Sequence, residues 1–368
     1  MKFHVPYNYL PIQFGGRKDI FAKWEELAST GEFTLGPYVT DFEEKFADYM
    51  ETTYCVSTNT GTDALILALK AVGIKSGDEV ITAPNSFYAT TGAIVACGAK
   101  PVFVDVDCRM QIDVELIEAK ITQQTRAILP VFWAGGAPNM ARIEQIAKIH
   151  NLKVVSDACM AIGGRYSGRT AANWGDIAAY SMHPLKSLNV MGDGGAISTN
   201  NVEYATWLRK YRNHGMINRN EIEFYGVNSR IQPLQAIVAS IELEKLDDVI
   251  MRRNKIASIY DEAFSTLAPR VQVVPRIKGD LETFCLYMIQ VVDRDNLLGE
   301  LIRAGVEAKV HYPIPLHRQA ASRVLKLNSD ALSAADLQAS RIITLPCHQF
   351  LDDVQVEHVI KVIAKFLA

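Results

Sequence analysis

The chain has 368 residues, of which 49% are hydrophobic and 21% are charged, and this balance excludes a disordered or fibrous protein. Its 38 Lys and Arg nearly balance its 41 Asp and Glu, so the net charge is −3 and a dedicated nucleic-acid binder is excluded. No run approaches the roughly 20 apolar residues of a membrane span, and the first residues lack the apolar core of a secretory signal. We therefore expect a globular protein of the cytoplasm.

The six cysteines are spread along the chain without a close pair, at Cys55, Cys97, Cys108, Cys159, Cys285 and Cys347. There is no C-x-x-C motif and no ladder of spacings, so neither a zinc site nor a disulfide framework is expected. We therefore expect reduced thiols and no metal centre.

Short apolar runs alternate with helical patterns between residues 50 and 200. The predicted strands cover residues 54–56, 79–83, 101–106, 127–132, 152–156 and 196–198. Helices are predicted between them at 64–72 and 143–150, where apolar residues recur with helical spacing. Continuous apolar strands separated by helices are typical of a mostly parallel sheet covered on both faces. The sequence therefore predicts an α/β fold.

The pattern changes beyond Pro233. A long helical segment is predicted over residues 234–260, and strands at 285–292 and 308–312 and a helix at 354–367 follow it. We predict a large domain over residues 1–245 and a smaller C-terminal α/β domain over residues 246–368. No linker rich in Gly, Pro or Ser separates them, so they are expected to pack tightly.

Three polar segments follow predicted strands, at the edge where open α/β sheets bind their ligands. The first is STNTGTD (57–63), a turn that leads into an apolar helix. Free N–H groups at the helix start and the Thr62 hydroxyl suit a phosphate. An ordinary helix cap explains the same residues, so this segment alone leaves both interpretations open.

The second polar feature is Asp157, which directly follows the strand predicted over 152–156. A carboxylate at the end of a buried strand is costly unless it is paired or hydrogen-bonded. Asp157 is a candidate metal ligand, helix cap or partner of a protonated ring nitrogen. The residue alone does not distinguish these roles.

The third polar segment is SMHPLK (181–186), followed by the glycine-rich MGDGG (191–195). Lys186, confined near a strand end, is a candidate for a Schiff base with an aldehyde cofactor, although most lysines are solvated surface residues. Taken together, the three segments match what pyridoxal phosphate requires. Its phosphate needs a helix N-terminus, its ring nitrogen needs a carboxylate and its aldehyde needs an amine.

With these residues the chain resembles the DegT–DnrJ–StrS family of pyridoxal-phosphate-dependent sugar aminotransferases, which have the aspartate-aminotransferase fold (fold type I). Six segments carry the resemblance in order along nearly the whole chain: GEFTLGPYVTDFEEKFADY (31–49), GTDAL (61–65), DEVITAPNSFYAT (78–90), SMHPLK with the glycines of 192–195, YGVNSRIQPLQA (225–236) and HYPIPLH (311–317).

The resemblance implies a role for each matching residue. Lys186 would form the internal aldimine with pyridoxal phosphate, and Asp157 would lie against the pyridinium nitrogen, so both are expected to be catalytic. Phe87 would stack on the ring. The phosphate would be held by the turn residues Gly61 and Thr62 and the Asp63 N–H, by Ser181, and by Asn228 of a neighbouring subunit. The last assignment predicts a homodimer with shared active sites.

Four further residues are candidates for contacts with the substrate: His183, Arg230, Tyr312 and His317. Arginine can grip a carboxylate or phosphate with two hydrogen bonds, but loop histidines and aromatic residues are as often structural. One departure from the family is Met160, where relatives commonly have a glutamine that bonds the cofactor's phenolic oxygen. A thioether cannot donate that bond, so we expect different surroundings for the ring.

The activity implied by the resemblance is transfer of an amino group from glutamate to a nucleotide-linked keto-sugar. The product would be an amino sugar for a cell-surface polysaccharide or a secondary metabolite. Two alternatives stay open. A sugar dehydratase of the same family would have a histidine in place of the lysine or cysteines for an iron–sulfur cluster, and the sequence shows neither. A non-enzymatic regulator would need a DNA-binding module, and no appended basic segment is visible.

Overall fold

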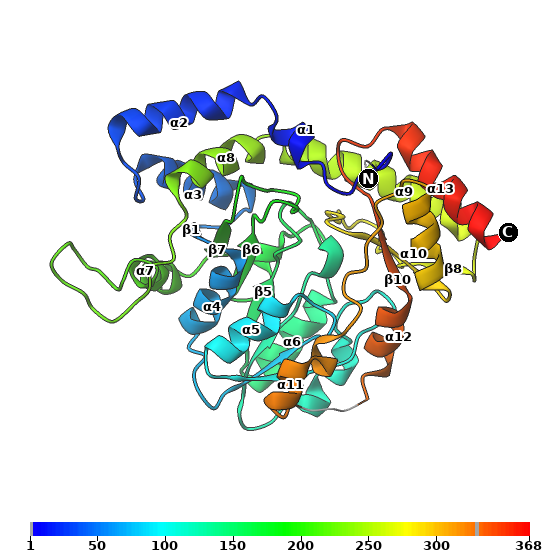
Figure 1. Cartoon of the computed structure of the whole chain (residues 1–368). Coiled ribbons are helices and arrows are strands. Elements are labelled where there is room, and N and C mark those ends of the chain that lie inside the picture. The colour runs from blue at the N-terminus through cyan, green and yellow to red at the C-terminus, as the bar shows by residue number, and fades with distance from the viewer. Residues whose placement is uncertain (1–2, 328–330) are drawn as a thin grey trace.

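The computed structural model of the chain describes residues 3–327 and 331–368, and its strands form two separate sheets (Figure 1). The strands are β1 (Tyr54–Thr58), β2 (Glu79–Thr82), β3 (Lys100–Phe103), β4 (Thr125–Leu129), β5 (Lys153–Asp157), β6 (Ile177–Ser181), β7 (Gly195–Thr199), β8 (Val271–Val273), β9 (Tyr287–Val291) and β10 (Ile342–Leu345). The α-helices are α1 (Leu10–Phe14), α2 (Lys18–Thr30), α3 (Pro37–Tyr49), α4 (Gly61–Ala71), α5 (Tyr88–Ala96), α6 (Met140–His150), α7 (Val202–Tyr211), α8 (Pro233–Leu243), α9 (Leu246–Ser265), α10 (Arg294–Arg303), α11 (Ala320–Val324), α12 (Ser333–Arg341) and α13 (Asp353–Leu367).

The large sheet has the strand order β1-β7-β6-β5-β4-β2-β3. Five strands run parallel to one another: β3, β2, β4, β5 and β6. Strand β7 pairs antiparallel with both β6 and β1. The mostly parallel sheet predicted from the sequence is confirmed.

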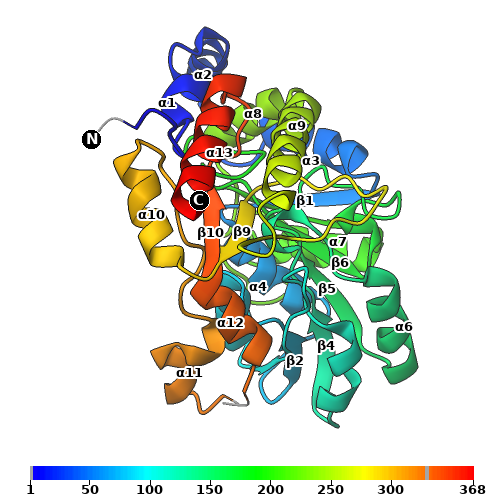
Figure 2. The same cartoon turned by 90° about the vertical axis from the view of Figure 1, so that its right-hand side faces the viewer.

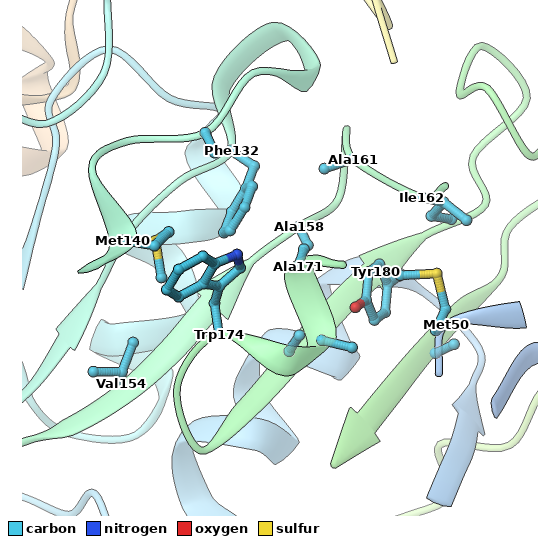
Figure 3. Packing of buried hydrophobic residues seen from close by; sticks show 14 of the residues in the cluster. Met50, Phe132, Met140, Val154, Ala158, Ala161, Ile162, Ala171, Trp174 and Tyr180 are labelled. Atoms are coloured by element: carbon cyan, nitrogen blue, oxygen red, sulfur yellow. The ribbon is translucent and has the colours of Figure 1, made fainter. Parts of the chain in front are cut away.

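Helices cover both faces of the large sheet. Because successive residues of a strand point to opposite faces, Val80 and Ile81 of β2 belong to different hydrophobic clusters. One cluster contains apolar residues of α4, α5 and α7, and the other contains those of α3, α6 and α8. Figure 3 shows the rings of Phe132, Trp174 and Tyr180 inside the second of these clusters. Burial on both sides explains why successive residues within these strands, such as Val154 and Val155 of β5, are apolar.

The small sheet is antiparallel, with the order β10-β9-β8, and it packs with α9, α10 and α13 around a third hydrophobic cluster (Figure 2). Helix α13 begins at a capping box between Asp352 and Gln355. Val5, near the N-terminus, is buried in this third cluster and bridges to Val306. The division of the chain into domains at residue 245 stays a prediction.

Two predicted elements differ from the structure. The helical segment predicted over 234–260 is two helices, α8 and α9. Helix α8 packs against α2 and α3, whereas the C-terminal half of α9 packs on the third cluster. The strand predicted over 308–312 is reduced to a single bridge between Lys309 and Thr344, since His311 and Tyr312 turn toward a cavity instead of pairing. No helix in the described part of the chain is long and apolar enough to cross a membrane.

Candidate active site

A cavity of about 400 Å³ lies at the C-terminal ends of the parallel strands. Its walls come from residues that follow β2 and β4, from the ends of β5 and β6, and from the segments 285–286 and 311–312. This is the place where open α/β sheets bind ligands. Eight residues predicted from the sequence line it: Gly61, Thr62, Phe87, Asp157, Ser181, His183, Lys186 and Tyr312.

The start of α4 forms one end of the cavity. Thr60 caps the helix, because its hydroxyl accepts a hydrogen bond from the Asp63 N–H at 3.0 Å. That bond occupies the amide that the resemblance assigned to the phosphate. The N–H groups of Gly61 and Thr62 have no acceptor in the described part of the chain, as is usual for a first helical turn. The turn therefore caps the helix and also leaves two free N–H groups that can bind an anion.

Asp157 ends β5 and is 4% exposed. Its Oδ2 accepts a hydrogen bond from the Thr90 hydroxyl at 2.6 Å, and its Oδ1 accepts one from the Cys159 N–H at 3.2 Å. These two donors compensate part of the cost of burying the carboxylate. The carboxylate still lines the cavity, so it can accept a further bond from a ligand.

Lys186 lies in the turn that follows β6. Its backbone carbonyl accepts a hydrogen bond from the Tyr9 hydroxyl at 3.2 Å, and Tyr9 in turn accepts one from the buried Arg253. No carboxylate of the described residues forms an ion pair with the Lys186 amine. An amine that faces a cavity without a counterion is available to react with a carbonyl group.

Two histidines near Lys186 stay neutral at pH 7. Burial lowers the pKa of His311 to about 4, with smaller contributions from the charges of Lys186 and Lys309. Burial also lowers the pKa of His183, helped by Lys186 and opposed by Asp193. Lys186 is the one lysine or arginine among the described residues that line the cavity.

Aromatic rings form the wall next to Phe87. The Phe87 ring lies 5.1 Å from that of Tyr88 and 5.8 Å from that of Tyr312, between ring centroids. Trp133 extends the cluster, 5.7 Å from Tyr312. Such a wall suits a flat ring or the apolar face of a sugar.

The resemblance and the motifs missed several lining residues. Tyr7 comes from the N-terminal segment and stacks on His311 with 5.8 Å between ring centroids. Cys285 comes from the segment 285–286, and Ser86 comes from the loop after β2. Tyr7 and Cys285 reach the cavity only through packing of distant segments, so no local pattern identifies them, whereas Ser86 lies beside Phe87 within the 78–90 segment.

Met160 lies in the wall of the cavity and is 8% exposed. Its thioether lies among the apolar residues of the cluster beneath α4 and α5. A ligand in the cavity can therefore reach Met160, but the thioether cannot donate a hydrogen bond to it.

Four predicted residues lie outside the cavity lining: Asp63, whose amide is bonded to Thr60, and Asn228, Arg230 and His317. Asn228 is exposed, and Arg230 donates a hydrogen bond to Asn213 at 2.8 Å. His317 is buried, 3.1 Å from an Asp336 oxygen, and its ring meets the edge of Phe103. The structure therefore gives His317 packing neighbours and no contact with the cavity.

The arrangement combines an amine, a buried carboxylate and free backbone donors around one volume. No group of three or more potential metal ligands occurs among residues 3–327 and 331–368. The chemistry available to these side chains is attack on a carbonyl, proton transfer by the amine and binding of an anion at α4.

Comparison with known proteins agrees with this chemistry. The model of the DegT/DnrJ/EryC1/StrS aminotransferase family matches residues 16–364. A Pseudomonas aeruginosa protein described as UDP-2-acetamido-2-deoxy-3-oxo-D-glucuronate aminotransferase is 36% identical over 89% of this chain and 90% of its own length. A Geobacillus stearothermophilus protein described as a pleiotropic regulatory protein is also 36% identical, over 99% of this chain and 98% of its own length.

Solved structures give the same result. DesV of S. venezuelae, in complex with a ketimine intermediate, superposes with a TM-score of 0.96 at 33% identity and covers 100% of this chain and 99% of that chain. NtdA of Bacillus subtilis with bound cofactor PMP superposes with a TM-score of 0.91 at 30% identity, covering 99% of this chain and 87% of that chain. The predicted fold and the predicted enzyme class, a transaminase, are confirmed. The chain belongs to the DegT/DnrJ/EryC1/StrS aminotransferase family.

Proposed function

We propose that this chain transfers the amino group of glutamate to a nucleotide-linked keto-sugar, with pyridoxal phosphate held in the central cavity. One observation carries the proposal: the Lys186 amine, the Asp157 carboxylate and the free amides of α4 line the same volume. The names of relatives supply the substrate class, because several are described as transaminases of UDP- or dTDP-linked sugars.

The residues present fit the cofactor. The free N–H groups of Gly61 and Thr62 and the hydroxyl of Ser181 would hold its phosphate, and Phe87 would cover one face of its ring. Asp157 would accept a hydrogen bond from the ring nitrogen and favour its protonated form. When bound, the cofactor supplies an electron sink for the carbanion at the donor's α-carbon.

Nucleophilic attack and proton transfer are assigned to Lys186 of the chain itself. The Lys186 Nζ would be the nucleophile toward the cofactor's aldehyde and, as a free amine, the base that takes the donor's α-proton. Burial lowers the pKa values of the neighbouring His183 and His311, so these two rings add no positive charge beside the amine at pH 7. A ping-pong sequence follows, in which the keto acid leaves before the keto-sugar enters the same volume.

The test is absorbance of the purified protein loaded with pyridoxal phosphate, followed by borohydride reduction and peptide mapping. We expect a visible band that glutamate bleaches, and a pyridoxyl tag on Lys186. Lys186→Ala should lose turnover by at least about 1,000-fold, because it removes both the nucleophile and the base. The matched control is Lys100→Ala, since Lys100 is exposed on β3 and should leave turnover unchanged. A tag on another residue would contradict the proposal.

A homodimer with shared active sites is part of the proposal, because Asn228 is exposed and outside the cavity of its own chain. Mixing two inactive variants tests it. Equal amounts of Lys186→Ala and Asn228→Ala, unfolded and refolded together, should regain about a quarter of wild-type sites, since half of the dimers then carry one intact site. No regain would contradict the sharing of sites.

A regulatory role is the alternative, and the name of the Geobacillus relative supports it. A dehydratase is the second alternative. In both cases the loaded protein would show a visible band that glutamate does not bleach, so the same absorbance measurement separates these outcomes from transamination.

A further inference from the structure

Two buried hydroxyl groups form a chain that ends on Asp157. The Ser86 Oγ lies 2.5 Å from the Thr90 Oγ1, and the Thr90 Oγ1 lies 2.6 Å from the Asp157 Oδ2. Ser86, Thr90 and Asp157 are 3%, 1% and 4% exposed, so bulk water does not compete for these bonds. All three residues line the central cavity.

The direction of the chain follows from proton counting. A hydroxyl carries one proton, and an ionised carboxylate only accepts, so Thr90 must donate its proton to Asp157. The short contact to Ser86 then requires Ser86 to donate to Thr90. The bond from Thr90 to Asp157 has a charged acceptor, so it is of the strong, charge-assisted kind. The bond from Ser86 to Thr90 polarises it further.

The position of Thr90 shows that the contact is specific. Thr90 lies in the first turn of α5, where a threonine hydroxyl commonly bonds to the backbone of its own helix. Here the hydroxyl leaves the helix and reaches Asp157, which is 67 residues away along the chain. The next residue, Thr91, has a buried hydroxyl with no hydrogen-bond partner among the described residues.

The second carboxylate oxygen is also held. The Cys159 N–H donates to Asp157 Oδ1, so both oxygens have a fixed donor and the plane of the carboxylate is set. Burial raises the pKa values of the Cys159 thiol and the Tyr312 hydroxyl, so both neighbours are neutral at pH 7. Lys186, in the turn after β6, lines the same cavity.

We propose that Thr90 is a positioning residue, which, supported by Ser86, holds the Asp157 carboxylate toward the cofactor's ring nitrogen. The inference rests on the proposed function, since it assigns a role to residues around the same cofactor site. Thr90 is assigned its role through Asp157, to which its hydroxyl donates. Its removal leaves Asp157 in place and takes away the donor that orients and stabilises its charged form.

The test uses full-length variants loaded with pyridoxal phosphate. Thr90→Val keeps the shape and removes the hydroxyl, Thr90→Ser keeps the hydroxyl, and Ser86→Ala removes the second link. Thr91→Val is the matched control, because it removes the unpartnered hydroxyl of the neighbouring residue. The measurements are the dissociation constant of pyridoxal phosphate, the pH midpoint of the visible band, and kcat and KM for glutamate.

Thr90→Val should weaken cofactor binding and lower kcat by about 10- to 100-fold, the loss expected for one charge-assisted hydrogen bond, while KM for glutamate stays within about threefold. The midpoint of the visible band should move. Thr90→Ser should restore both properties. Ser86→Ala should have a smaller effect, and none in the Thr90→Val background, because Ser86 acts through Thr90.

Wild-type affinity and an unmoved band in Thr90→Val would overturn the inference, as would equal losses in Thr91→Val. Thermal unfolding of each variant identifies a loss caused by poor folding, and rescue by Thr90→Ser excludes it. If the wild-type protein binds no pyridoxal phosphate, the proposed function fails. If it binds and the Thr90 variants behave alike, only the present inference fails.

Discussion

Gly61 packs directly on Ser181. A Cβ on Gly61 would lie 2.5 Å from the Ser181 Cβ and 2.9 Å from its hydroxyl, closer than such atoms approach in proteins. Gly61 begins α4 and Ser181 ends β6, so the helix start with the free amides touches the strand that leads to Lys186. The glycine brings the two halves of the proposed phosphate site together.

Replacing Gly61 with alanine should weaken binding of pyridoxal phosphate by at least about tenfold, because a shift of a few tenths of an ångström misaligns the donors at α4. The measurement is equilibrium binding followed by absorbance. The control is Gly92→Ala in α5, where a Cβ would meet no atom within 4 Å. That variant should bind normally and gain up to about 1 kcal/mol in free energy of unfolding, since alanine favours the helix.

Asp157→Asn keeps the volume of the side chain and removes its charge. We expect kcat to fall by at least about 100-fold, because the ring nitrogen loses a charged hydrogen-bond partner. Steady-state turnover with glutamate and a keto-sugar measures the loss. Asp19→Asn is the control, since Asp19 is half exposed on α2 and distant from the cavity. Equal rates for Asp157→Asn and the wild type would contradict the role proposed for Asp157.

Two buried histidines make folding stability depend on pH. Burial lowers the pKa values of His311 and His348 from 6.5 to about 4 in the folded chain. Between these values the unfolded chain takes up protons and the folded chain does not. The free energy of unfolding is therefore highest above pH 6.5 and falls as the pH drops toward 4, by at most about 3 kcal/mol for each histidine.

Urea unfolding at pH 7.5 and pH 5.0, followed by circular dichroism, measures this decrease. His348→Gln should make the difference between the two pH values smaller, because its share is removed. His4→Gln should keep the wild-type difference, since His4 is exposed. A free energy of unfolding that rises toward pH 5 in the wild type would contradict the argument.

His317→Ala separates structure from substrate binding. His317 is buried against Phe103 and Asp336, outside the cavity lining. We expect a loss of about 1–3 kcal/mol in free energy of unfolding from the lost packing and polar contact, with KM for the sugar unchanged. Tyr312→Ala should do the reverse and raise KM, because Tyr312 is part of the cavity's aromatic wall. A raised KM in His317→Ala would assign it to the substrate.

Much of the large sheet follows from local pattern. The β-branched runs and the helical spacings between them identify the parallel strands, since a strand buried on both faces must be apolar throughout. The polar residues that end these strands, Asp157 among them, converge because parallel strands end at one edge. The phosphate turn and Lys186 were predicted for the same reason.

The sequence by itself determined most strands of the large sheet, the family and the residues at the strand ends, because these depend on neighbours within a few positions. Only the tertiary structure decided which distant groups complete the cavity. Packing of segments far apart in the sequence places Tyr7, Thr90 and Cys285 in the same cavity lining as Asp157 and Lys186. It also buries His317 against Phe103, outside that lining. Such contacts leave no periodic signal, since each is set by the sum of many buried surfaces rather than by local conformation.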